Sequence, residues 1–374
     1  MLVYRRYWIL VLIFISLPAA SVEFSSAELA MLKAAGPWPP RVEPDPGNRF
    51  SADPKAIELG EVLFREPGLS RNGTISCATC HDPESAYVDN LALSPALGLP
   101  TRHTPTVLNT AVGAWFGWGG EADSLWAQSI RPILSKVEMD GAGDPLRALF
   151  EQDENYRLAL TEMLESPPEA LADETLLVFA GKVLAAYQET LITDRSAFDE
   201  FRDALVGSDG EKAGLYPAAA ARGAKIFFGG GGCSLCHFGP NFSNGEFASI
   251  ALPHMTATGR PDKGRYGGIQ QVKTSAFNRL GVYDDDSAKL RHWRTRGVKQ
   301  RHDAFGEFKV PALRSVAKTA PYMHDGSLAT LQDVVRHYNL IDLERLHMDG
   351  ESTLRPLGLS EAEIDDLVAF LATL

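Results

Sequence analysis

The chain has 374 residues, enough for two ordinary domains with a sizeable core in each. Hydrophobic residues make up 45% and charged residues 22%, a globular composition that excludes a disordered, collagen-like or multi-span membrane protein. The formal net charge of −12, from 36 basic and 48 acidic side chains, argues against nucleic acid as a partner, because phosphate backbones select basic surfaces.

The first 21 residues have the pattern of an export signal. An apolar run over residues 8–17 follows two arginines, and small residues at Ala19 and Ser21 suit cleavage at the end of this segment. The run is too short to span a bilayer comfortably, since that takes about 20 residues. An uncleaved N-terminal anchor is the alternative. We predict export to the periplasm of a Gram-negative bacterium, with no membrane span after cleavage.

A helix followed by the same five-residue motif occurs twice. Apolar residues at helical spacing predict a helix over Pro54–Phe64, and a glycine turn leads from it to Cys77-Ala-Thr-Cys-His81. A second predicted helix, Ala218–Phe228, leads through another glycine turn to Cys233-Ser-Leu-Cys-His237. The two helices match in type and spacing at Gly60-x-x-Leu63-Phe64 and Gly223-x-x-Ile226-Phe227. These matches indicate a tandem duplication.

The rest of the pattern is helical, with few strand signals. We expect helices over residues 171–192 and 330–338, and a last helix from Ser360, whose partner Glu363 completes a capping box. The sequence therefore predicts an all-α protein.

The link between the two halves is expected in residues 206–214, which are rich in glycine and charge. After the signal peptide (1–21), the predicted domains are thus 22–205 and 206–374. Each of them contains one Cys-x-x-Cys-His motif.

In a Cys-x-x-Cys-His motif both thiols add to the vinyl groups of haem, and the histidine binds the iron. A redox disulfide, a zinc half-site and structural disulfides are the alternatives. The two motifs use every cysteine of the chain, namely Cys77, Cys80, Cys233 and Cys236. Because chance does not produce two such matches from four cysteines, we predict two haem c groups in two cytochrome c-like domains.

The sixth position of each iron separates electron transfer from peroxide chemistry. No histidine or methionine lies between His81 and His103, so the first haem has no obvious second ligand, and an open iron can bind peroxide. For the second haem, spacing alone does not choose among the candidates, which are Met255, Met323, His324, His337 and Tyr338.

Several blocks along the chain resemble the bacterial dihaem cytochrome c peroxidase/MauG superfamily. They appear in family order over about residues 50–340 and comprise Arg71–His81 with Asp82-Pro83, Thr104–Asn109, Ala122–Leu125, Pro132–Met139, Val310–Arg314 and Thr319–Gly326. The resemblance implies a periplasmic enzyme with two covalent haems that uses hydrogen peroxide.

The resemblance also assigns roles to residues of the first half. His81 matches the proximal ligand of the peroxide-reacting haem, and His237 matches that of the electron-transfer haem. Glu138 matches the distal acid, with Gln128 and Pro132 lining the same pocket. A carboxylate suits that place, because heterolytic O–O cleavage moves a proton between the two peroxide oxygens. Without the family, Glu138 would be taken for a solvated helix charge.

Two further positions bear on how oxidising equivalents travel. Trp118 matches the tryptophan between the two haems, an electron relay, although a lone aromatic is more often core. Tyr338 lies fourteen residues beyond His324, where the peroxidase branch has methionine and the MauG branch has tyrosine. A tyrosinate stabilises ferric and high-valent iron, whereas a thioether favours ferrous iron. An amphipathic helix residue is the alternative for Tyr338.

The first haem points to the same branch. Typical peroxidases of the family have a histidine after the first motif that blocks the iron until reduction, and residues 82–102 contain none. A permanently open haem would need no reductive activation.

The chain also departs from the family. The resemblance implies an interdomain calcium site with carbonyl ligands at Thr319 and Pro321, but His103 replaces its asparagine, and calcium prefers oxygen donors. Gly119-Gly-Glu-Ala122 replaces Asp-Gly-Arg-Ala, and Gly231 replaces a surface tryptophan of MauG. Any electron exit to a protein substrate must therefore differ from that of MauG.

The leading hypothesis is a MauG-like enzyme in which peroxide produces a high-valent iron state that oxidises an aromatic residue, tryptophan first, of a partner protein. The runner-up is a peroxidase taking electrons from a small cytochrome c or copper protein, and a third reading is a carrier without catalysis. A basic cluster over residues 292–302 is open to three readings: a solvated loop, a contact to haem propionates, or a contact to an acidic partner. Trp293 within it is a candidate surface hopping residue or a loop anchor.

Overall fold

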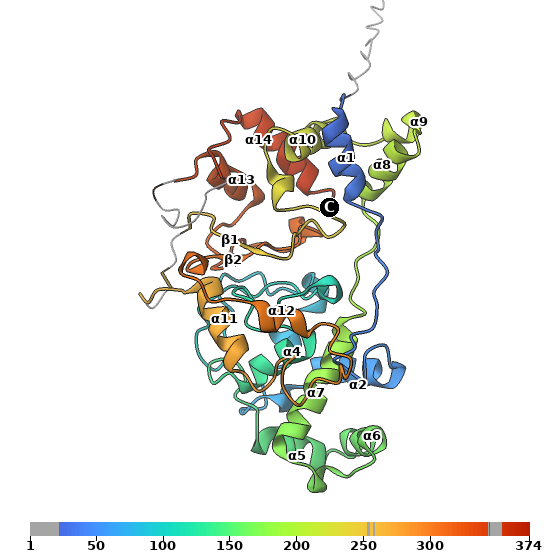
Figure 1. The fold of residues 1–374 in the computed structure, drawn as a ribbon, viewed down its shortest axis with the longest axis vertical. Helices are drawn as coiled ribbons and strands as arrows, with labels where there is room; N and C mark the ends of the chain where they lie inside the picture. Colours follow the sequence, from blue (N-terminus) through green and yellow to red (C-terminus); the bar gives the residue numbers. More distant parts are fainter. Residues whose placement is uncertain (1–21, 253–254, 257–258, 343, 345–353) are drawn as a thin grey trace, which may run out of the picture.

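The structure is a computed structural model that describes residues 22–252, 255–256, 259–342, 344 and 354–374. The predicted export signal lies outside the described residues. Figure 1 shows two helical halves placed one above the other along the long axis, with a small two-stranded ribbon between them. Helices contain 45% of the residues and strands 3%. The all-α prediction is therefore confirmed as a mostly helical fold, with one short ribbon that it did not include.

The lower half in Figure 1 is built around the first core, where α2, α4 and α7 pack together. Its helices are α2 (Pro54–Phe64), α3 (Cys77–Cys80), α4 (Leu125–Leu134), α5 (Asp144–Gln152), α6 (Glu154–Leu164) and α7 (Asp173–Gln188). Helix α7 is the centre of this half, because 13 of its 16 residues, from Leu176 to Gln188, are buried. A helix that is apolar all round belongs in the middle of a core.

The upper half is built around the second core, in which α10 packs against α14. Its helices are α1 (Ser26–Ala34), α8 (Ala197–Val206), α9 (Gly210–Ala213), α10 (Ala218–Phe228), α13 (Leu331–Asn339) and α14 (Glu361–Leu371). Five phenylalanines fill this core with mostly edge-to-face ring contacts: Phe198, Phe227, Phe228, Phe242 and Phe370. Ser360 and Glu363 form the predicted capping box of α14.

The duplicated glycines lie at equivalent helix crossings. A Cβ at Gly60 of α2 would come within 2.1 Å of the Val183 carbonyl oxygen in α7. A Cβ at Gly223 of α10 would come within 2.0 Å of the Asp366 carbonyl oxygen in α14. Only glycine allows backbones to approach this closely. The two predicted repeats therefore have a matching close contact between helices, α2 with α7 and α10 with α14.

The two cores do not divide the chain at a single point. Helix α1 packs in the second core, and the chain crosses from α7 to α8 through residues 189–196. The expected link, residues 206–214, contains α9 and lies beside α8. The indole of Trp38 donates a hydrogen bond of 2.8 Å to the Thr193 carbonyl, which ties the two crossing segments together.

Part of the second half of the sequence returns to the first core. Helices α11 (Gly264–Thr274) and α12 (His292–Gly297) lie against the lower half in Figure 1, and Phe277 and Tyr283 pack on the first core. The ribbon pairs β1 (Phe247–Ala248) antiparallel with β2 (Phe308–Lys309). Short 3₁₀ turns complete the chain at Pro67–Leu69, Pro83–Ser85, Thr110–Val112, Pro168–Ala170, Cys233–Leu235, His302–Ala304 and Val316–Lys318. No helix in the described part is long and apolar enough to cross a membrane.

Candidate haem sites

One continuous cavity of about 1980 Å³ is lined by both Cys-x-x-Cys-His motifs. It contacts Cys77, Cys80 and His81 in the first half and Cys233, Cys236 and His237 in the second. A site for one drug-sized ligand is about 300–1,000 Å³. The cavity therefore has room for two large prosthetic groups.

The first motif presents its histidine in a defined orientation. Cys77 to Cys80 form the single turn α3, and the His81 amide donates to the Cys77 carbonyl at 2.8 Å. The His81 Nδ1 lies 3.3 Å from the Tyr87 carbonyl, which leaves Nε2 as the metal-binding nitrogen. Burial lowers the pKa of His81, which favours the neutral imidazole that binds iron.

The second motif repeats this arrangement with different residues. The His237 amide donates to the Cys233 carbonyl at 2.9 Å, and its Nδ1 lies 3.0 Å from the Phe242 carbonyl. Tyr87 and Phe242, which supply the two carbonyls, both have left-handed backbones, with φ of 59° and 51°. Bulky residues rarely adopt that conformation, and such strain concentrates at functional sites. Both motifs thus hold a histidine whose Nε2 would be able to bind a haem iron.

The alternatives to covalent haem fit the motifs less well. No disulfide joins the four cysteines, and burial raises the pKa of both Cys77 and Cys233 to about 12, whereas redox-active cysteines have lowered values. Among the described residues, the group of His, Cys, Asp and Glu side chains close enough to hold a metal ion is Asp284, Asp286 and His292, which includes no cysteine. The motifs and the cavity therefore suit haem better than zinc or a redox disulfide.

The first half of the cavity contains the predicted distal set. Gln128 and Pro132 are one turn apart on α4 and Glu138 lies in the turn after it, and all three line the cavity. Residues at i and i+4 share a helix face, which explains why Gln128 and Pro132 meet in one pocket. Arg131 donates to the Gln128 side-chain carbonyl at 3.0 Å and orients it.

Glu138 is half-buried in the cavity wall. Burial raises its pKa, the charge of Glu121 adds to this, and Arg131 opposes both. A buried carboxyl with a raised pKa is the kind of group that serves in acid–base catalysis. The role of Glu138 as the distal acid stays a prediction.

Trp118 lies where the two halves meet. Its indole donates to the His103 carbonyl at 2.8 Å, and its own carbonyl accepts from the Lys309 amide of β2 at 2.8 Å. The His103 amide in turn donates to the His324 carbonyl at 2.8 Å. Trp118 is half-buried and lines the cavity, so it is held between the two motif regions.

Tyr338 lines the cavity from the second half. It lies near the end of α13, whose Leu331 and Val335 are buried in the second core. Burial raises the pKa of Tyr338, and the nearby Cys233 and Cys236 add to this. Tyr338 thus lies near the second motif, and its role as an iron ligand stays a prediction.

The predicted calcium ligands lie close to the same boundary. Thr319, Pro321 and His103 all line the cavity. The Nδ1 of His103 already interacts with the Leu91 carbonyl at 2.9 Å, and imidazole is a poor calcium ligand in any case. The calcium site stays a prediction.

Three charged residues of the cavity were missed by the sequence reasoning. Arg102 pairs with Asp262 through two hydrogen bonds of 2.7 and 2.6 Å and also contacts Glu121, the acid that departs from the family pattern. Arg102 therefore joins the two halves of the chain. Burial lowers the pKa of Lys309 to about 8, and an anionic group in the cavity would raise it again. Haem carboxylates are such groups. In the sequence, the only signal that Arg102 belongs to the cavity is its position next to His103.

Comparison with known proteins gives a consistent result. The family model of the di-haem cytochrome c peroxidases matches residues 54–205. The chain is 31% identical over 360 residues to the methylamine utilization protein MauG of Methylorubrum extorquens, covering 95% of this chain and 87% of that protein. It is 33% identical over 375 residues to the cytochrome-c peroxidase IdrP1 of Denitromonas iodatirespirans, covering 95% and 89%.

A solved structure shares the fold. The diheme peroxidase BthA from Burkholderia thailandensis superposes with a TM-score of 0.65 at 22% identity, covering 87% of this chain and 86% of that one. The likeness extends through both halves of the molecule.

Proposed function

This chain belongs to the di-haem cytochrome c peroxidase family, and on that premise we propose that it is a MauG-like periplasmic enzyme. It would use hydrogen peroxide to oxidise an aromatic residue, tryptophan first, of a partner protein. Peroxide takes up two electrons and two protons and leaves as two water molecules, and the partner residue loses the two electrons.

The observation that carries the proposal is Tyr338 at the second motif's end of the cavity. Two bound haems would supply the redox-active iron on which peroxide reacts. A phenolate is a hard anionic donor that favours oxidised iron, so it suits a haem that shares oxidising equivalents rather than one that waits for electrons. Glu138 would move the proton between the peroxide oxygens while Gln128 and Pro132 shape the pocket.

Trp118 gives the oxidising equivalents a path between the halves. It lies on the cavity wall and is fixed by hydrogen bonds to both sides. A partner residue can then be oxidised from a distance, without entering a substrate pocket.

The test is to add one equivalent of hydrogen peroxide to the fully oxidised protein and to follow its visible, near-infrared and EPR spectra. We expect an oxidised species that lasts for minutes without prior reduction. No reaction until one haem is reduced would overturn the proposal.

A second measurement tests the ligand itself. Tyr338→Met should raise the reduction potential of the second haem and permit its ready reduction, while Tyr338→Phe should leave the iron without this ligand. An unchanged spectrum and potential in both variants would show that Tyr338 is not bound to iron.

The second candidate is a peroxidase that takes electrons from a small cytochrome c or copper protein. The 33% identity to a relative named as a cytochrome-c peroxidase favours it. It predicts rapid peroxide turnover with such a donor and only after reduction of one haem.

A further inference from the structure

The segment from 287 to 301 carries six of the chain's 36 basic side chains and none of its 48 acidic ones. It includes α12 and lies in a chain whose net charge is −12. We call its exposed basic residues that make no salt bridge, together with Leu290 and Trp293, the basic patch; Arg301 is exposed but pairs with Asp303. Its basic members are Lys289, Arg294, Arg296 and Lys299.

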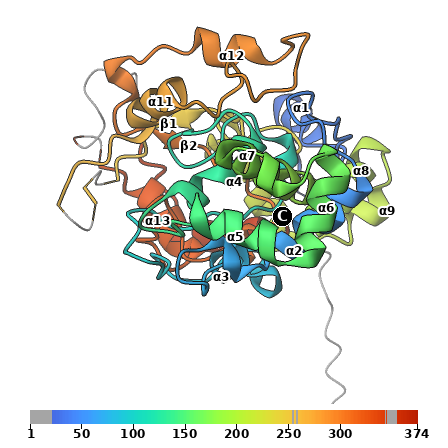
Figure 2. The same cartoon turned by 90° about the horizontal axis from the view of Figure 1, so that it is seen from below.

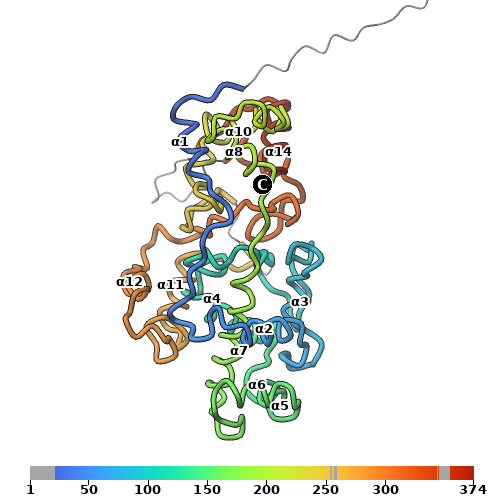
Figure 3. Tube along the Cα trace, turned by 90° about the vertical axis from the view of Figure 1, so that its right-hand side faces the viewer, coloured from blue at the N-terminus to red at the C-terminus, as the bar shows by residue number. Residues whose placement is uncertain are grey.

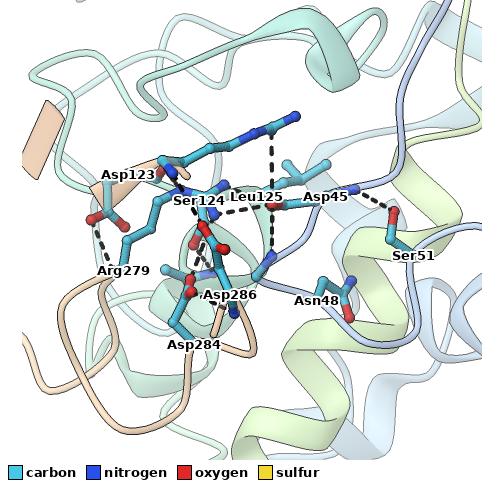
Figure 4. Close-up of polar contacts among 12 residues, drawn as sticks. Asp45, Asn48, Ser51, Asp123, Ser124, Leu125, Arg279, Asp284 and Asp286 are labelled. Carbon is cyan, nitrogen blue, oxygen red and sulfur yellow. Dashed lines mark hydrogen bonds and ion pairs between the residues drawn. The ribbon is translucent and has the colours of Figure 1, made fainter. Parts of the chain in front are cut away.

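The acidic residues that precede the patch point inward. Asp284 and Asp286 are buried, and Asp285 pairs with Lys182 of α7 at 2.5 Å. Figure 4 shows Arg279 lying among Asp45, Asp123 and Asp284, and its two hydrogen bonds to Asp45 are 3.0 and 2.7 Å long. The segment's negative charge is thus neutralised inside the molecule.

Helix α12 faces the protein with its small polar residues and faces solvent with its large ones. His292 and Thr295 are buried, and the Thr295 hydroxyl donates to Asp123 at 2.6 Å. Trp293 is 65% exposed, with the Arg294 guanidinium 5.2 Å from its ring centre. Leu290 is 65% and Val282 91% exposed. A tryptophan and arginines in the open are the residue types that dominate protein interfaces.

The basic members of the patch are available for a partner. Among the described residues, Lys289, Arg294, Arg296 and Lys299 make no salt bridge. None of the segment's residues lines the haem cavity, which removes contact with haem propionates as their role. Figures 2 and 3 both show α12 at the outer edge of the molecule.

Helix α12 is tied to the segment that follows Trp118. Asp123, the partner of Thr295, is five residues beyond Trp118 and also accepts from the Arg279 amide at 3.0 Å. The same connection therefore fixes α12 to the chain that lies between the two haem motifs.

We propose that the basic patch is the docking surface for an acidic protein, the partner that the proposed function requires. The positive patch attracts carboxylates while the acidic remainder of the surface repels them, and this orients the encounter. Trp293 and Leu290 supply the apolar centre of the contact. The inference rests on the proposed function for the claim that the bound partner is oxidised. The binding test does not depend on that function.

A membrane surface fits the patch less well. Helix α12 has only six residues and buries part of its length against the protein, whereas interfacial helices lay a long apolar face into the lipid. The net charge of −12 would also oppose approach to anionic lipid.

The test uses the full-length protein with both haems and a fluorescent poly-glutamate peptide carrying one tryptophan, with its poly-lysine counterpart as control. We expect the acidic peptide to bind and its dissociation constant to rise about tenfold between 50 and 300 mM salt. The double variant Arg294→Glu/Arg296→Glu should weaken binding by at least about tenfold. Trp293→Ala should weaken it without changing the salt dependence.

The matched control is Lys33→Glu/Lys212→Glu, which makes the same change of charge on α1 and α9, away from the patch. Equal loss of binding in both double variants would overturn the proposal, because net charge alone would then explain the affinity. No binding of the acidic peptide would also overturn it. So would binding of phosphatidylglycerol vesicles, lost in Arg294→Glu/Arg296→Glu, with no binding of the peptide. Failure of the unmodified protein to react with peroxide would instead count against the proposed function.

Discussion

The two halves of the molecule hold their motif histidines in the same way and differ in the other residues that they contribute to the cavity. In each half, a glycine allows two helices to cross closely, and a turn leads from there to the motif. The histidine Nδ1 then lies within hydrogen-bond distance of the carbonyl of a residue with a left-handed backbone. Among the residues that line the cavity, the first half contributes Glu138 and the second contributes Tyr338. On the proposed function, the two similar halves would give their haems different roles.

The residues that distinguish the two halves chemically lie outside the repeated helix and motif. Glu138 comes from the turn after α4, and Tyr338 comes from α13, and neither has a counterpart in the other half's motif. The half-buried motifs would fix where each haem is attached, and the other residues that line the cavity would decide its chemistry. Substitutions at matched positions of the two halves, or in one half alone, test this difference.

Loss of either cysteine pair should have the largest effect. Cys77→Ala/Cys80→Ala and Cys233→Ala/Cys236→Ala should each reduce the protein from two covalent haems to one, measured by the mass of the denatured chain. Only the first variant should lose the reaction with peroxide, because its site contains Glu138. Loss of the reaction in the second variant alone would reverse the assignment of the two halves.

Glu138→Gln should slow the reaction with peroxide by about 10²–10⁴-fold, the usual contribution of a general acid–base group. Burial raises the pKa of Glu138 above 4.5, and the carboxylate is the form that accepts the first proton. The stopped-flow rate should therefore fall as the pH drops through this raised value, and the Gln variant should lack that step. Glu58→Gln, an exposed change on α2, is the control and should match the unmodified protein.

The buried ion pairs of the two halves should differ in cost. Asp199 is the carboxylate bound by Arg314, and both side chains are 1% exposed. Asp199→Asn should lower the free energy of unfolding by about 3–5 kcal/mol. Asp45→Asn should lower the free energy of unfolding by less, because Arg279 keeps its ion pair with Asp284 and its hydrogen bond to the Asp123 carbonyl. Urea unfolding of both variants checks the order, and equal costs would contradict it.

The Asp199 variant also has a pH signature. Burial opposes ionisation, but hydrogen bonds from Arg314 and Ser196 hold the pKa of Asp199 below its usual 3.8. Its stabilisation is present above that unfolded value and is lost as the pH falls through the folded one. The gap in unfolding free energy between Asp199→Asn and the unmodified protein should therefore shrink in acid.

The smallest effect is expected from the two glycines. Gly60→Ala and Gly223→Ala should each cost about 1–3 kcal/mol of unfolding free energy, because the new Cβ would overlap a carbonyl oxygen. Gly210→Ala is the control, because a Cβ at this position has no neighbouring atom within 4 Å. It should leave stability unchanged or raise it slightly, and thermal melts of all three variants check this. A cost in one half only would mean that the two crossings are not equivalent.

The sequence by itself determined the features that depend on neighbours along the chain. The motif spacing, the bounds of α2 and α10 and the capping box of α14 were all predicted, and the structure has them at those residues. Local periodicity and fixed spacing are enough for such features, because the interacting groups are within a few turns of one another.

Only the tertiary structure decided which residues meet across the fold. Residues 262–301 return to the first core, α1 packs in the second, and Arg102 pairs with Asp262, 160 positions away. No local pattern encodes these contacts, since they follow from how apolar faces and buried charges are satisfied together. The same packing turned the acids of 284–286 inward and left the basic patch outside.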